Sequence, residues 1–120
     1  MNYFFDTYAI VEVINRNKNY QKFQEVEIAT SVLNMGELYS IVLRNEGKAS
    51  ADIWYHRLKH TILSADIDIV IKAMLFKFAH KKKNLSFVDC VAYITAMEHG
   101  MIFLTGDKEF CDVPFVEFVK

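Results

Sequence analysis

The sequence is poor in the residues that interrupt a chain or tie it together. It has 4 glycines and 1 proline in 120 residues, so long structureless loops are not expected. Its 2 cysteines, Cys90 and Cys111, lie far apart, with no CxxC pattern and no clustered histidines. This spacing argues against a zinc site and favours two free, buried thiols in a reducing compartment.

The sequence also lacks a strong net charge, a basic leader and a long apolar run. The formal net charge is -1, so contact with nucleic acid would depend on local basic patches. No apolar run approaches the roughly 20 residues that a membrane span requires, so we expect a cytoplasmic protein that does not enter a membrane. The hydrophobic fraction of 52% and the aromatic fraction of 14% predict a folded globule, with residues 1–120 forming a single domain.

Strand-like and helix-like patterns alternate along the chain. The apolar runs at residues 3–5 and 101–105 predict strands that are buried on both faces. Weaker strands are predicted at residues 26–30, 61–65 and 115–119, the last at an edge of the sheet. Helices are predicted at residues 7–15, 20–25, 31–46, 49–59, 66–80 and 86–99. The helix at 66–80 carries the apolar residues Val70, Met74 and Phe78. Strands separated by helices predict one α/β domain with a parallel sheet.

Four acids fall at comparable positions of this predicted fold. Asp6 and Asp107 follow the two most apolar strands, at the carboxyl ends where ligands bind in open α/β sheets. Glu37 lies in the second turn of one predicted helix and Asp89 in the first turn of another, and both helices would reach the same edge. Carboxylates that meet there would raise each other's pKa unless a cation lies among them. Oxygen-only ligands suit Mg²⁺ or Mn²⁺, and these ions support phosphodiester hydrolysis.

Each acid also has a structural alternative. Asp6 fits the N-cap of a helix, Glu37 fits a solvated helix face, and residues 105–107 fit an ordinary turn. Ser86 and Asp89 have the spacing of a capping box. Taken one at a time, these alternatives are preferred. Together they leave unexplained why the four acids fall at mutually reachable positions, and a shared site explains that better.

The same residues carry a resemblance to the PIN-domain family, in particular to its small VapC-type ribonuclease toxins. Phe5-Asp6-Thr7 resembles the family's first strand followed by Asp and Thr or Ser, and Asn34-Met35-Gly36-Glu37-Leu38 resembles its second-helix acid followed by Leu. The stretch 85–96 is similar to its Asp-initiated, Ala-rich helix, and the stretch 104–110 is similar to its closing Thr-x-Asp-x-Asp-Phe signature. No single motif is specific, but their order and spacing cover essentially the whole chain.

The resemblance implies a PIN-like three-layer fold with a five-stranded parallel sheet in the order 3-2-1-4-5, flanked by helices. It implies an endoribonuclease that depends on Mg²⁺ or Mn²⁺ and acts on RNA. It further implies a homodimer, and inhibition by a VapB-like antitoxin that inserts a peptide into the active-site groove. The alternative is a catalytically silent PIN-like module that keeps the fold for protein contacts. A haloacid-dehalogenase phosphatase is disfavoured, because it needs a second Asp where this chain has Tyr8.

Roles for single residues follow from their positions in this predicted fold. Asp6, Asp89 and Asp107 are expected to bind the metal directly or through water. Glu37 is expected to be a further ligand or to orient the attacking water. The supporting residues are Thr7 and Thr105, which would orient carboxylates, and Glu109, which stands where the family often has Asp and ranks below the four main acids. Asn34, one turn before Glu37, either contacts substrate or water or is an ordinary polar helix position, and the second interpretation is preferred.

Two groups of residues outside the acids have open interpretations. The basic residues Lys81, Lys82, Lys83, His56, Arg57, Lys59 and His60 are either contacts for the RNA backbone or solvated helix ends. The aromatic residues Tyr8, Tyr20 and Phe23 belong either to the core or to an interface.

Overall fold

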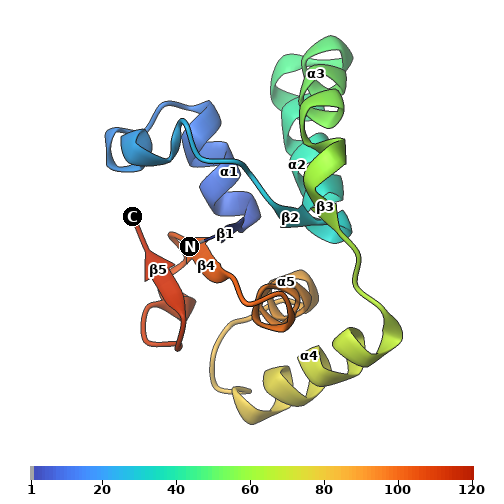
Figure 1. The fold of residues 1–120 in the computed structure, drawn as a ribbon, viewed down its shortest axis with the longest axis vertical. Coiled ribbons are helices and arrows are strands. Elements are labelled where there is room, and N and C mark those ends of the chain that lie inside the picture. Colours follow the sequence, from blue (N-terminus) through green and yellow to red (C-terminus); the bar gives the residue numbers. More distant parts are fainter. Residues whose placement is uncertain (1) are drawn as a thin grey trace.

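The structure is a computed structural model that describes residues 2–120. Strands and helices alternate along it as βαβ units (Figure 1). The strands are β1 (Tyr3–Phe5), β2 (Thr30–Ser31), β3 (Ile62–Leu63), β4 (Ile102–Thr105) and β5 (Val116–Phe118). The α-helices are α1 (Thr7–Ile14), α2 (Val32–Glu46), α3 (Lys48–Leu58), α4 (Ile67–Ala79) and α5 (Phe87–Glu98). Short 3-10 helices form η1 (Lys18–Phe23), η2 (Lys59–Thr61) and η3 (Lys108–Phe110).

Local capping chemistry sets the helix boundaries close to those that the sequence predicts. Asp6, Ser31, Asp66 and Ser86 each stand before an α-helix and accept a hydrogen bond from one of its first N–H groups. Gly47 ends α2 with φ of 94°, a conformation that glycine adopts without strain. The expected helix at residues 20–25 is instead the 3-10 helix η1.

The expected five-stranded sheet in the order 3-2-1-4-5 is wrong for residues 2–120. β1, β4 and β5 form a three-stranded parallel sheet, and β2 pairs separately with β3. One parallel bridge, Phe4 to Ala29, connects the two sheets, with a hydrogen bond of 2.8 Å from the Phe5 N–H to the Ala29 carbonyl. The ladder stops there because the Phe5 carbonyl accepts a hydrogen bond from the Thr30 hydroxyl at 2.8 Å instead of from a backbone N–H.

The three layers expected of the fold follow from the two faces of the central strands. Phe4 pairs with Phe103 in register, and both pack in the core formed with α4 and α5. The next pair, Phe5 and Leu104, faces the other way into the core formed with α1, α2 and α3. All four side chains are fully buried. Both faces of the sheet are therefore covered, which explains why these strands are continuous apolar runs.

Several side chains lie elsewhere than the sequence indicates. Tyr20 and Phe23 are buried in the core, which settles their open interpretation. Cys90 and Cys111 are both free, but Cys111 is exposed, whereas both thiols were expected to be buried. Phe78, on α4, is 70% exposed. Within residues 2–120, no helix is both long enough and apolar enough to cross a membrane.

Candidate active site

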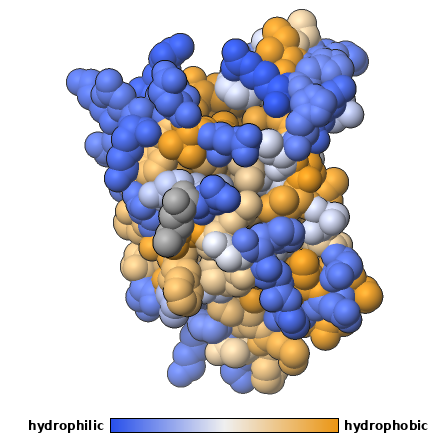
Figure 2. Space-filling model, in the orientation of Figure 1, coloured by the Kyte–Doolittle hydropathy of each residue, from blue (hydrophilic) through white to orange (hydrophobic). Residues whose placement is uncertain are grey.

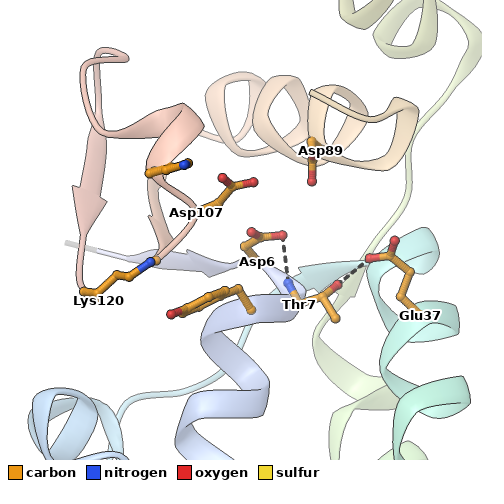
Figure 3. Close-up of a pocket in the computed structure, with 9 residues that line it drawn as sticks. Asp6, Thr7, Glu37, Asp89, Asp107 and Lys120 are labelled. Atoms are coloured by element: carbon orange, nitrogen blue, oxygen red, sulfur yellow. Dashed lines mark hydrogen bonds between the residues drawn. The ribbon is translucent and has the colours of Figure 1, made fainter. Parts of the chain in front are cut away.

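A pocket of about 430 Å³ lies at the carboxyl ends of β1 and β4. The four acids singled out in the sequence, Asp6, Glu37, Asp89 and Asp107, all line it. They come from four different elements: the end of β1, helix α2, the start of α5 and the turn after β4. Figure 3 shows their carboxylates directed toward a common space. The structure thus brings together the acids whose proximity the sequence could only suggest.

Asp6 lies at the centre of this arrangement because the sheet fixes its backbone. Its N–H donates to the Leu104 carbonyl at 3.0 Å, which continues the β1–β4 pairing by one residue. One carboxylate oxygen, Oδ1, accepts from the Thr7 N–H at 2.8 Å, and Oδ2 accepts from the Thr105 hydroxyl at 2.7 Å. Asp6 is only 4% exposed. Asp6 therefore caps α1 through Oδ1, while Oδ2 has a separate partner on the β4 side, and the carboxylate still lines the pocket.

Glu37 is held by a hydrogen-bonded chain of buried polar side chains. The Thr7 hydroxyl donates to Glu37 Oε1 at 2.7 Å, as the dashed line in Figure 3 shows. Thr7 in turn accepts from the Asn34 side-chain amide at 2.9 Å. Asn34 is completely buried, so its contacts are with Asp6 and Thr7, and it lies out of reach of substrate or solvent water, the contact that the less favoured interpretation of the sequence assigned to it.

Asp89 and Asp107 also cap helices while they line the pocket. Asp89 forms the expected capping box, in which its Oδ2 accepts from the Ser86 N–H at 2.8 Å and its own N–H donates to the Ser86 hydroxyl at 3.1 Å. Asp107 accepts from the Glu109 N–H at 3.0 Å and starts η3. Both acids therefore make the local hydrogen bonds that the structural alternatives describe, and their carboxylates line the pocket as well.

Glu109 lies apart from the other acids. It is absent from the residues that line the pocket, and its carboxylate accepts from the Asn84 N–H at 2.7 Å, in the loop between α4 and α5. Close by, Lys83 and Asp112 form an ion pair of 2.7 Å. The longer arm of Glu109, compared with Asp, ties this loop to η3.

Four further residues line the pocket: Tyr8, whose role the sequence left open between core and interface, and Gly106, Lys108 and Lys120, which the sequence did not single out. Lys108 directly follows Asp107, and Lys120 reaches the pocket because β5 lies beside β4. These two lysines are the cations of the pocket. The basic residues 56–60 and 81–83 are not among its lining residues.

The surroundings of the pocket disfavour the ionised forms of Asp6 and Asp89. Burial, the largest cause, and the negative charges of Asp89 and Glu37 raise the pKa of Asp6, the hydrogen bonds from Thr105 and Thr7 oppose the rise, and the net result is a pKa of about 7. Burial also raises the pKa of Asp89, and the charge of Asp107 adds to that effect. A cation placed among these groups would favour their ionised forms.

This electrostatic strain predicts how the stability of the metal-free protein depends on pH. The folded pKa of Asp6 is raised above its ordinary value of 3.8, so the folded state binds a proton that the unfolded state releases. The free energy of unfolding should therefore fall by on the order of 2–3 kcal/mol between about pH 5 and about pH 8. Urea unfolding in the presence of EDTA measures this change. The Asp6→Asn variant should lose most of it, and equal pH dependence in the two proteins would contradict the assignment.

The donors around the pocket suit a hard divalent cation. All four acidic side chains offer oxygen, and neither histidine nor cysteine lines the pocket. Across residues 2–120, however, no three acidic, histidine or cysteine side chains stand close enough together to enclose a metal ion. Oxygen donors of this kind suit Mg²⁺ or Mn²⁺, which keep several of their waters, so some of the four acids would act through those waters and not as direct ligands.

Comparison with known proteins places the fold. The family model of the PIN domain matches residues 3–116. No curated protein matches the chain.

Solved structures of similar fold include a toxin and toxin–antitoxin complexes. VapC20 of Mycobacterium tuberculosis, described as a sarcin-ricin loop cleaving toxin, is similar with a TM-score of 0.81 and 19% identity over 99% of this chain and 100% of that chain. A toxin–antitoxin complex from Klebsiella pneumoniae is similar with a TM-score of 0.80 and 18% identity, over 97% and 96% of the two chains. VapBC2 of Rickettsia felis, bound to a DNA fragment from its promoter, is similar with a TM-score of 0.72 and 19% identity over 100% of each chain.

Proposed function

The chain belongs to the PIN-domain family, and on this premise we propose that it is a VapC-type endoribonuclease that depends on Mg²⁺ or Mn²⁺. One observation carries the proposal: four carboxylates from four separate elements line a single pocket at the carboxyl ends of β1 and β4. Two lysines at the same pocket suit a polyanionic substrate. Similar structures include a toxin described as cleaving an RNA loop, which favours RNA as the substrate class.

The roles we propose follow from the position of each side chain. Asp6, Asp89 and Asp107 would hold the divalent ion, directly or through its waters, and Glu37 would add a ligand or orient the attacking water. When bound, the ion would polarise the scissile phosphate and make a nearby water more acidic. Thr105 and Thr7 keep the carboxylates of Asp6 and Glu37 in place by donating hydroxyl hydrogens to them. Lys108 and Lys120 would contact the phosphate backbone.

The test is an RNA cleavage assay with the purified protein, freed of any partner, with Mg²⁺, Mn²⁺ or EDTA present. Cleavage is expected with either ion and not with EDTA, and mapping of the RNA ends would identify the target sequence. Absence of metal-dependent cleavage would overturn the proposal. It would favour the alternative, a catalytically silent PIN-like module that binds other proteins.

We also propose a VapB-like antitoxin as a partner. The support is that similar structures are described as toxin–antitoxin and VapBC complexes. The pocket carries four carboxylates against two lysines, so a basic peptide segment would complement it and exclude both ion and RNA. The RNA substrate would place the protein in the cytoplasm.

An exposed apolar stripe on α4 supports the proposed homodimer. Ile67, Ile71, Leu75 and Phe78 are spaced to fall on one face of the helix, and they are 69%, 53%, 66% and 70% exposed. Figure 2 shows apolar surface among polar side chains at the lower right, where α4 lies in Figure 1. We call these four residues the α4 stripe. Contiguous exposed apolar surface of this kind marks an interaction site.

The charges at the two ends of α4 favour a second copy as the occupant of the α4 stripe. Asp66 and Asp68 stand at the start of the helix, and Lys81 and Lys82 follow its end, all exposed. In a two-fold symmetric contact the same surface meets itself. Antiparallel packing of two α4 helices would place the acidic start of one beside the basic end of the other. The dimer we propose is therefore complementary in charge as well as apolar.

Replacing Leu75 by glutamate should dissociate this dimer. The substitution places two negative charges at the middle of the symmetric contact, while the folded monomer tolerates it because the side chain is 66% exposed. Light scattering coupled to size exclusion should show a dimer for the unmodified protein and a monomer for Leu75→Glu. Ile53→Glu on α3, where Ile53 is 58% exposed, is the matched control and should remain dimeric. A monomeric unmodified protein, or a dimeric Leu75→Glu variant, would contradict the proposed surface.

A further inference from the structure

The Asn34 side chain, near the pocket, uses both its carbonyl oxygen and its NH₂ group in hydrogen bonds. It is fully buried on α2, one turn before Glu37. Its Oδ1 accepts from the Ser31 hydroxyl at 2.6 Å. Its Nδ2 donates to the Thr7 hydroxyl oxygen at 2.9 Å and to Asp6 Oδ1 at 3.4 Å. Among residues 2–120, no buried side-chain nitrogen or oxygen lacks a partner, so this network is complete.

The order of donors in the network has only one consistent direction. The Ser31 hydroxyl accepts from the Asn34 backbone N–H at 3.2 Å, so its hydrogen is available to the Asn34 carbonyl oxygen. That contact turns the NH₂ group of Asn34 toward Thr7 and Asp6. Thr7 then uses its own hydrogen for Glu37. Both branches therefore end on a carboxylate, which accepts hydrogen bonds best when it is ionised.

The network crosses the place where the sheet is interrupted. Asp6 and Thr7 follow β1, whereas Asn34 and Glu37 belong to α2, which follows β2. β1 and β2 are joined by a single bridge, so no continuous ladder sets the position of α2 relative to the end of β1. The Asn34 side chain adds a further connection beyond that bridge, because it contacts the residues that follow β1 and belongs to the helix that carries Glu37.

We propose that Asn34 is a positioning residue that holds the carboxylates of Asp6 and Glu37 in one fixed relative geometry across the gap between the two sheets. An amide is suited to this role because it offers one acceptor and two hydrogens at once. A serine or threonine has a single hydrogen to donate, and an aspartate has none when ionised and adds charge beside Asp6. The catalytic consequence rests on the proposed function, whereas the positioning itself does not.

The first experiment uses Asn34→Ala and the milder Asn34→Ser, with Thr95→Val as the control. Thr95 is also fully buried, but its hydroxyl donates to the Val91 carbonyl within α5, away from the network. The turnover number for RNA cleavage should fall on the order of 10- to 100-fold in Asn34→Ala, less in Asn34→Ser, and little in Thr95→Val. The Michaelis constant should change less, because RNA contacts remain. The Mn²⁺-induced rise in melting temperature should shrink in the same order.

A double-substitution cycle separates positioning from a general loss of stability. If Asn34 acts through Glu37, Asn34→Ala should reduce turnover much less in a Glu37→Gln background than in the unmodified protein. A loss of equal size in both backgrounds would overturn positioning through Glu37. Asn34→Ser provides the same comparison if Asn34→Ala does not fold.

A crystal structure of the folded variant tests the geometry without any activity. We expect the Glu37 carboxylate to leave Thr7, or that of Asp6 to rotate, and unchanged positions of both would overturn the proposal. If the unmodified protein neither cleaves RNA nor responds to Mn²⁺, but the variant displaces these carboxylates, the proposed function fails and the positioning role stands. If cleavage is metal-dependent and the variant keeps both geometry and turnover, the positioning role fails alone.

Discussion

Asp6→Asn is expected to abolish RNA cleavage while it makes the metal-free protein more stable at neutral pH. The substitution removes the negative charge at the centre of the pocket but preserves the shape of a side chain that is only 4% exposed. Losing metal-assisted stabilisation of the transition state costs about 4 kcal/mol, which corresponds to a rate reduction on the order of 10³-fold. Stability should rise because burial makes the ionised form of Asp6 unfavourable, as its pKa of about 7 indicates.

The same variant should lose the response to metal. An ion that binds only the folded protein stabilises it by about 2.7 kcal/mol at a hundredfold excess over its dissociation constant. For a domain of this size that corresponds to a rise in melting temperature of roughly 10 °C. Calorimetry with Mn²⁺ and with EDTA should show this rise for the unmodified protein and little of it for Asp6→Asn.

Asp52→Asn is the matched control for this experiment. Asp52 is an aspartate on α3, outside the pocket, where it pairs with Lys48 at 2.6 Å and accepts from the Tyr39 hydroxyl at 2.7 Å. Its loss should leave cleavage and the Mn²⁺ response unchanged. If Asp6→Asn cleaved RNA at the unmodified rate, with the usual Mn²⁺ response, Asp6 would not belong to a metal site.

Gly106→Ala is expected to destabilise the protein more than any other single-methyl addition to its glycines. A Cβ at position 106 would lie 2.2 Å from Cε1 of Tyr8 and 2.5 Å from the Val119 carbonyl oxygen. The tyrosine ring could turn aside, but the oxygen belongs to the backbone beside β5 and accepts a hydrogen bond from the Tyr20 hydroxyl. Relief of the overlap requires this backbone to move, at a cost of about 3 kcal/mol. Thermal unfolding should show a melting temperature lower by roughly 10 °C.

Gly36→Ala provides a control of the same chemistry with the opposite sign. Gly36 lies inside α2, and a Cβ there would meet nothing within 4 Å. Because alanine favours the helix more than glycine does, this variant should gain about 1 kcal/mol. The pair of variants distinguishes steric overlap at position 106 from a general effect of adding a methyl group. Equal stability of the two variants would show that β5 does not pack against the turn after β4 in this way.

The sequence predicted the secondary structure well where the cause is local. Helix starts depend on a side chain and the N–H groups within three residues of it, and Asp66 and Ser86 could be recognised by that spacing alone. The two strongest strands were recognisable because both of their faces are buried. The convergence of the four acids could also be predicted, since parallel strand ends and the following helix starts share one edge of the sheet.

The sequence was less informative where a side chain or a strand has several possible partners in the folded protein. α4 has apolar residues on two faces, and only the structure shows that Ile69 and Ala73 face the core while Phe78 is exposed. For Glu109, ranked below the four main acids, the sequence left the partner of the carboxylate open; it accepts from the Asn84 N–H, while the Glu109 N–H donates to Asp107. The five-stranded sheet failed at Thr30, whose side chain takes the place of a ladder donor.

The sequence by itself determined the helices, the two central strands and the gathering of acids at one edge, because each depends on neighbours along the chain. Only the tertiary structure decided how those acids are held. The Asn34–Thr7 hydrogen bond joins residues 27 apart, and the Thr105–Asp6 bond joins residues 99 apart. A side-chain hydrogen bond of this kind requires its two atoms to be placed within a few tenths of an ångström. That placement comes from the packing of α1, α2 and β4 around the buried Asp6, and no spacing in the sequence encodes it.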